Sequence, residues 1–164
     1  MDRRRDLRGA NLADADLIGV NLSAARLSRA KFPRANLHLT NLSEANLAGA
    51  DLRRARLLET NLAATDLHDA NLSKANLAEA NLAEANLAEA TLARANLTRA
   101  NVHRVFAHRS DTDLTGAILD KAILDKAILD GANLTGTKRD PAQSPVWPNG
   151  LTLPTTHGTP QADG

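Results

Sequence analysis

Histidine, the side chain most often used for acid–base and metal chemistry, occurs five times, scattered along the 164-residue chain. The histidines do not fall on one face of the regular repeat described below; they are His38, His68, His103, His108 and His157. His103 and His108 lie close together and could hold a metal ion with Asp111, but three such residues in an exposed loop are ordinarily solvated. We therefore expect no metal site.

Catalytic motifs are missing from the sequence as well. No serine has a histidine and an aspartate at a spacing that the predicted geometry would bring together, and the motifs GxGxxG, GxxxxGK[ST] and HExxH do not occur. The chain contains no cysteine, which excludes disulfide bonds and thiolate chemistry. We predict a protein that is not an enzyme and that uses no cofactor.

The composition bounds the fold and the partners. Hydrophobic residues make up 43% of the chain and aromatic residues only 2%, so the core must consist of leucine and alanine. Twenty Lys and Arg against nineteen Asp and Glu give a net charge of +1, which favours neither a polyanionic nor a polycationic partner. No run of 18 apolar residues could span a membrane, and Met1 to Arg8 lacks the apolar stretch of a signal peptide. We expect a cytoplasmic location.

A five-residue repeat dominates the sequence. Leucine recurs at every fifth position from Leu7 to Leu97, with Phe32 at one of these positions and Val102 at the end, which makes 20 consecutive units of the form Ala-Asn/Asp-Leu-x-x. At about 100° per residue, a helix would spread these leucines around its axis, and a flat strand would alternate them between its faces. A chain that turns by about 90° in each unit buries them all. This predicts a four-sided coil of 20 residues, stacked at the strand spacing of about 4.8 Å.

These units, from residue 5 to 136, resemble the pentapeptide repeat proteins. The resemblance implies an all-β fold, a right-handed quadrilateral β-helix of about six coils, and its hand comes from the resemblance alone. It also implies that the central leucine and the residue two places before it fill the interior, while the other three positions face solvent. We expect the β-helix to cover residues 1–137 and an irregular Pro/Gly-rich tail to cover residues 138–164.

The repeat breaks after Val102 and resumes at Leu114 in a register shifted by two residues. We predict that residues 103–110 form a loop, with Val105 and Phe106 folding back onto the wall of the β-helix.

In the last units, isoleucine takes the outward position before leucine, at Ile118, Ile123 and Ile128. An exposed apolar surface of this kind usually has a partner. Either the tail folds back over it or a second copy of the chain covers it in a homodimer, and the protein is otherwise a monomer.

Residues 20 apart are expected to stack on one face of the coil. On the face centred on Leu12 and Leu52, this gathers a set of cations that we call the basic stripe, against Asp14 and Asp51 as the acids. The basic stripe consists of Lys31, Arg34, Arg53, Arg54, Lys74 and Arg94.

Two other kinds of column follow from the same spacing. The opposite face carries an asparagine column whose amides should bond to one another or to turn backbone. The column consists of Asn21, Asn41, Asn61, Asn81 and Asn101. Glu79 should pair with Arg99, and Glu84 with Arg104.

The family that the chain resembles includes quinolone-resistance and self-immunity proteins, which imitate DNA and bind type II topoisomerases such as DNA gyrase. An imitation of B-DNA about 24 Å long should carry about 14 negative charges. Between Asp6 and Arg104 this chain has 11 acidic and 12 basic residues, which disfavours mimicry by the whole rod. The acid-rich segment from Glu59 to Glu89 and the 103–110 loop still allow a local topoisomerase contact.

We therefore favour a rigid protein-interaction module with a protein partner that the sequence does not identify. The candidate contacts are the basic stripe, Phe106 and the three isoleucines. Direct binding of nucleic acid is disfavoured, because no aromatic residues are interleaved with the cations for base stacking.

Overall fold

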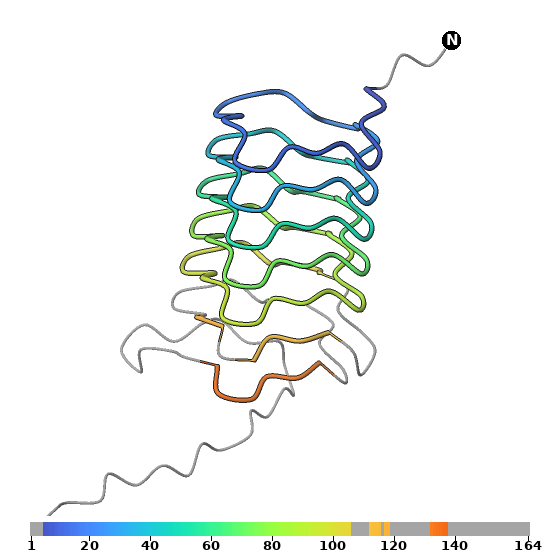
Figure 1. Ribbon diagram of the computed structural model, residues 1–164. Helices are drawn as coiled ribbons and strands as arrows, with labels where there is room; N and C mark the ends of the chain where they lie inside the picture. Colours follow the sequence, from blue (N-terminus) through green and yellow to red (C-terminus); the bar gives the residue numbers. More distant parts are fainter. Residues whose placement is uncertain (1–4, 106–111, 116, 119–131, 138–164) are drawn as a thin grey trace, which may run out of the picture.

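The computed structural model describes residues 5–105, 112–115, 117–118 and 132–137, and the chain winds there into a stack of four-sided coils (Figure 1). In each unit, the residue before the central leucine forms a parallel β-bridge with the residue 20 positions later, from Asp6 with Arg26 to Asn81 with Asn101. In this part of the chain the bridges are isolated and alternate with turns, so there are no extended strands with bounds to give. The hand of the coil stays a prediction.

Backbone hydrogen bonds join each coil to its neighbours. The leucine N–H and the N–H of the residue two places later both donate to the next coil, as from Leu52 to Asn71 O at 2.7 Å and from Arg54 to Ser73 O at 3.0 Å. The residue before the leucine donates to the preceding coil, and the small residue of the next unit closes the turn onto the leucine carbonyl. The ladder fixes the register of every unit at 20 residues per coil.

Each turn places its third residue, two after the leucine, at positive φ. Glycine occupies this position at Gly19 and Gly49, but most units have another residue there, such as Glu44 at 58° or Lys74 at 61°. This is the arrangement of a type II turn, in which the third residue is usually glycine because other residues are strained in the left-handed region. The coil closure imposes the conformation on whatever residue stands there.

Most of the aspartates and asparagines before the leucines cap the turns, and Asn36 is an exception, because its buried Oδ1 accepts no hydrogen bond. The N–H of the residue after the leucine does not join the ladder; instead it donates to the side-chain oxygen two residues earlier, as from Ser73 to Asn71 Oδ1 at 3.0 Å. Where Lys31 replaces the capping residue, the position after the central Phe32 is Pro33, which has no N–H to satisfy. The preference for Asn and Asp in the unit therefore has a local cause.

The interior contains the leucines and the small residues, as predicted. From Leu22 to Ala117 the described side chains at these positions are buried, and Phe32 is fully buried among them. Leu7, Leu12 and Leu17 in the first coil are only partly buried, as is Ala132 near the other end. Threonine replaces the small residue at four interior positions among the described residues, Thr40, Thr60, Thr65 and Thr112. The buried Thr60 hydroxyl donates to a backbone carbonyl oxygen at 2.7 Å, so its burial leaves no unpaired donor.

The predicted start of the loop at His103 was wrong. Residues 101–105 form a regular unit: Val105 is 1% exposed in the interior small position, and its N–H donates to Val102 O at 3.3 Å. Val105 therefore does not fold back onto the outer wall, because the interior accepts a valine where most units have alanine. The remainder of the predicted loop, Phe106 to Ser110, lies outside the described residues.

The two-residue shift of register is confirmed. Thr91 bridges Asp113 and Asn96 bridges Ile118, each across 22 residues in place of 20. Leu114 and Leu134 are buried, and the residues before them face outward. Ile118 takes the same outward bridge position and is partly exposed.

Ile123, Ile128 and the tail over residues 138–164 lie outside the described residues, so the cover of the isoleucines stays a prediction. Within the described ranges, no helix is long and apolar enough to cross a membrane.

The asparagine column bonds as predicted from Asn41 to Asn101. Asn61 donates to Asn41 Oδ1 at 3.2 Å, Asn81 donates to Asn61 Oδ1 at 3.3 Å, and Asn101 donates to Asn81 Oδ1 at 3.0 Å. The Asn81 oxygen also accepts the Ala83 N–H at 3.2 Å. Asn61 and Asn81 thus each link three coils and cap their own turns.

Replacing Asn81 by leucine is expected to lower the free energy of unfolding by about 2–3 kcal/mol, because three hydrogen bonds of about 1 kcal/mol each are lost. Asn81→Asp keeps the acceptor and loses only the amide donor, and Asp66 already takes this role beneath Asn86 in another column. Urea denaturation of both variants tests this. Equal losses would show that the side-chain oxygen contributes nothing.

Candidate functional site

Four cations of the basic stripe form one straight column on the outside of the coil. Arg34, Arg54, Lys74 and Arg94 occupy the third turn position of successive coils, at φ of 59–61°, and all four are exposed. Their N–H groups all donate to the next coil at 2.8–3.0 Å. The ladder therefore holds their backbones about 4.8 Å apart along the rod.

Two arginines of the stripe are neutralised by the acids predicted on the same face. Arg34 Nε donates to Asp14 Oδ1 at 2.7 Å, and Arg53 donates to both carboxylate oxygens of Asp51, at 2.8 and 2.7 Å. These hydrogen bonds lower the pKa of both carboxyl groups, so each acid is ionised at neutral pH. Such exposed pairs contribute little to stability, but they remove two charges from the stripe.

Four cations of the stripe remain without a carboxylate partner among the described residues: Lys31, and three that share one column. No carboxylate of the described residues pairs with Arg54, Lys74 or Arg94, which we call the unpaired basic column. Beside it runs a groove of about 300 Å³. The groove is lined by Pro33, Arg34, Arg53, Arg54, Ser73 and Lys74. Lys31 is exposed on the flat part of the same face, where it bridges Asn11 and Asp51.

The two ion pairs predicted on other faces are present. Arg99 Nη1 lies 3.1 Å from Glu79 Oε1, and Arg104 Nη1 lies 3.4 Å from Glu84 Oε1. The acid-rich segment is therefore less negative at its surface than its sequence suggests.

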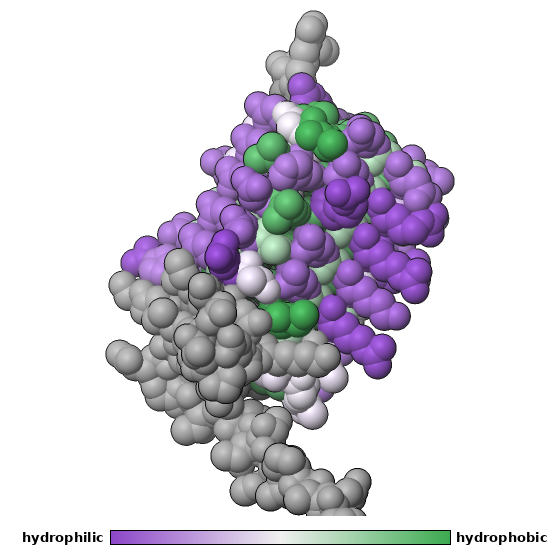
Figure 2. All heavy atoms as spheres, turned by 90° about the vertical axis from the view of Figure 1, so that its left-hand side faces the viewer, coloured by the Kyte–Doolittle hydropathy of each residue, from purple (hydrophilic) through white to green (hydrophobic). Residues whose placement is uncertain are grey.

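Sequence reasoning missed a second apolar feature near the start of the rod. Ile18 is 49% exposed and Leu39 is 51% exposed, both at outward turn positions. Figure 2 shows hydrophobic side chains interspersed in a mainly hydrophilic surface. The sequence signal for this exposure is an apolar residue at a turn position of the repeat, where most units have a polar or small residue. Phe106, the remaining predicted contact, lies outside the part of the chain that the structure describes.

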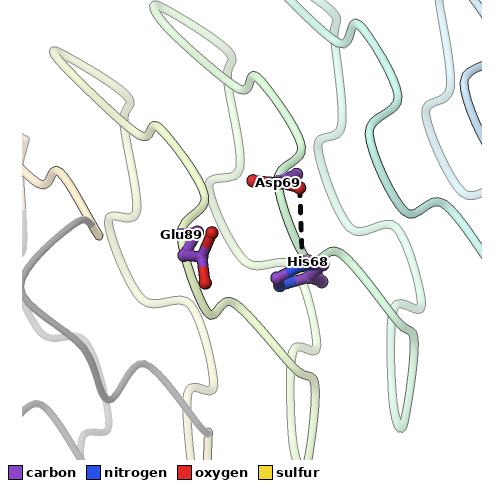
Figure 3. Close-up of side chains that lie close together, drawn as sticks. All are labelled: His68, Asp69 and Glu89. Carbon is purple, nitrogen blue, oxygen red and sulfur yellow. Dashed lines mark ion pairs between the residues drawn. The ribbon is translucent and has the colours of Figure 1, made fainter.

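A cluster of possible metal ligands was also missed (Figure 3). His68 Nε2 lies 3.4 Å from Asp69 Oδ2, and Glu89 follows one coil later at the same turn position as Asp69. One ligand atom from each of the three residues lies within 4.8 Å of the others. The sequence signal is the 20-residue spacing of Asp69 and Glu89, with His68 next to the first of them.

The model of pentapeptide repeats, in 8 copies, matches residues 6–44, 40–77, 75–111 and 110–138. The chain belongs to the pentapeptide-repeat family. This confirms the resemblance drawn from the five-residue spacing.

Several solved structures are similar to this pentapeptide-repeat protein. One from the Arabidopsis thaliana thylakoid lumen is 25% identical, with 75% of this chain and 70% of that chain covered, at a TM-score of 0.40. Rfr23 from the cyanobacterium Cyanothece 51142 is 29% identical over 87% of this chain and 91% of its own, at 0.38. QnrB1, a plasmid-mediated fluoroquinolone resistance protein, is 16% identical over 85% and 92%, at 0.40. Among curated protein sequences, none matches significantly.

Proposed function

We propose that this pentapeptide-repeat protein is a rigid, non-enzymatic interaction module, and that its unpaired basic column docks an acidic surface of a protein partner. The observation that carries the proposal is the contrast in pairing. Arg54, Lys74 and Arg94 stack in register without a carboxylate among the described residues, whereas Arg34, Arg53, Arg99 and Arg104 each contact one.

The spacing of the column suits a regular acidic partner. Backbones about 4.8 Å apart present their charges at nearly the separation of side chains on one face of a helix, where residues three or four apart lie about 5–6 Å from one another. A helix with carboxylates at this spacing could meet all three cations at once. Because the ladder holds the column in place, little conformational entropy of the backbone is lost on binding.

Nucleic acid is a less suitable partner for this surface. Phe32, the aromatic residue within the described ranges, is fully buried and offers no ring for base stacking.

Topoisomerase binding by partial DNA mimicry is the other alternative. The pairing of Glu79 and Glu84 with arginines weakens it, because paired carboxylates imitate DNA phosphates less well. A gyrase supercoiling assay with micromolar protein tests that alternative, which an unchanged activity would exclude. A cytoplasmic location stays a prediction from the sequence.

The proposal is tested with two polyanions of similar length, a fluorescent poly-L-glutamate of about 20 residues and a 20-base-pair DNA duplex. We expect poly-L-glutamate to bind, with an affinity that falls as salt is raised. The double variant Arg54→Gln, Lys74→Gln should weaken this binding about tenfold, since each exposed charge pair contributes up to about 1 kcal/mol. Tighter binding of the duplex, or unchanged binding by the variant, would overturn the proposal.

A further inference from the structure

The orientation of the His68 ring determines which of its two nitrogens can bind a metal ion. Its Nδ1 lies 3.1 Å from the backbone carbonyl oxygen of Ala88. A carbonyl oxygen only accepts hydrogen bonds, so Nδ1 carries the proton, and Nε2 of the neutral ring keeps a lone pair. That lone pair lies on the side of Asp69 and Glu89 (Figure 3). Histidines that bind metal ions are held in this way, with the other ring nitrogen donating to a carbonyl or carboxylate.

The distances within the cluster fit a metal ion. Two ligand atoms that each lie about 2.05 Å from a tetrahedral Zn²⁺ are about 3.3 Å apart. The 3.4 Å between His68 Nε2 and Asp69 Oδ2 nearly equals this separation. Glu89 comes from the next coil, and its ligand atom lies within 4.8 Å of the other two, a gap that a change of side-chain rotamer can close.

His68 and Asp69 line a groove of about 700 Å³ along the same corner of the rod, together with Arg8 and Arg29. Ser28, Ala48 and Gly49 line it with small side chains, which leaves room for water on a bound ion. Arg29, Gly49, Asp69 and Glu89 occupy the same turn position in successive coils. Gly49 therefore separates the Arg29 cation from Asp69 by one coil.

We propose that His68, Asp69 and Glu89 bind one divalent first-row transition-metal ion such as Zn²⁺, with water in the remaining coordination positions. One imidazole and two carboxylates form a mixed nitrogen and oxygen donor set. Mg²⁺ and Ca²⁺ prefer oxygen ligands alone, so the histidine selects against them. The site is independent of the unpaired basic column.

The chain contains a matched control for this site. His38 takes the same position in its own unit, and its Nδ1 lies 2.9 Å from the Leu58 carbonyl oxygen. Its neighbours differ, because Leu39 stands where the cluster has Asp69, while Glu59 corresponds to Glu89. His38 thus has the same orientation without the aspartate ligand.

Isothermal titration of the full chain with ZnCl₂ tests the proposal. We expect one Zn²⁺ per chain, at least a tenfold loss of affinity in His68→Gln and in Asp69→Asn, and no change in His38→Gln. Asparagine tolerates positive φ, so Asp69→Asn should stay folded, which circular dichroism checks. Leu39→Asp is expected to add a second ion. Absence of Zn²⁺ binding, or equal losses in His38→Gln and His68→Gln, would overturn the assignment.

Titration with Co²⁺ adds a spectroscopic test that does not depend on affinity alone. Visible absorption bands of bound Co²⁺ should appear with the parent chain and with His38→Gln. They should disappear with His68→Gln. Bands that persist in His68→Gln would place the ion elsewhere in the chain and contradict the proposal.

Discussion

Leu62→Ala is expected to lower the free energy of unfolding by about 2–5 kcal/mol. The Leu62 side chain is completely buried between the leucines one coil before and one coil after it. The backbone ladder fixes the coil spacing, so neighbouring coils cannot close over the cavity that the substitution leaves. Denaturation by urea, followed by circular dichroism, measures the change.

Leu12→Ala provides the control for this prediction. Leu12 has the same role in the first coil, but it is only partly buried. Shortening its side chain removes less buried apolar surface. We therefore expect the free energy of unfolding to fall by less than half as much as in Leu62→Ala. Because solenoids are stabilised by contacts between neighbouring repeats, equal losses at the two positions would contradict this description of the core.

Ala64→Val is expected to destabilise the protein by about 1–3 kcal/mol through the backbone alone. Ala64 is exposed and has φ of 53°, in the left-handed region that a β-branched residue rarely adopts. Ala64→Gly removes this strain and should be neutral or stabilising. Thermal unfolding of both variants measures the effect.

Ala63→Val separates backbone strain from side-chain size. Ala63 precedes Ala64 in the same turn and is not at positive φ. We expect Ala63→Val to change the stability by less than about 0.5 kcal/mol, as for an ordinary surface substitution. If both valine variants lose the same stability, the turn conformation is not the cause.

The five-residue period alone predicts the main features of the fold. A step of five residues that buries every leucine requires a four-sided coil, and the 20-residue stacking then follows. The asparagine column and the pairs Glu79–Arg99 and Glu84–Arg104 needed only this spacing, and the structure contains them.

Other features depend on contacts that the period does not encode. Val105 stays in the coil because the interior has space for a valine, which a pattern of alanines does not reveal. Arg and Glu residues favour helices in isolation, so the positive φ of Arg94 or Glu84 comes from coil closure and not from local preference. The stacking rule gathered the basic stripe, but the pairing of Arg53 with Asp51 depends on rotamers.

The affinity of poly-L-glutamate for Lys74→Gln, compared with that for Ala64→Glu, tests the proposed docking surface most directly. Both substitutions lower the net charge from +1 to 0, and both residues stand at the same turn position, half a coil apart. Glutamate fits at position 64 because Glu44 and Glu84 occupy this column naturally. We predict a loss of several-fold and a weaker salt dependence for Lys74→Gln, and a change of less than twofold for Ala64→Glu. Equal weakening would show that overall charge governs binding, which would contradict docking by the unpaired basic column.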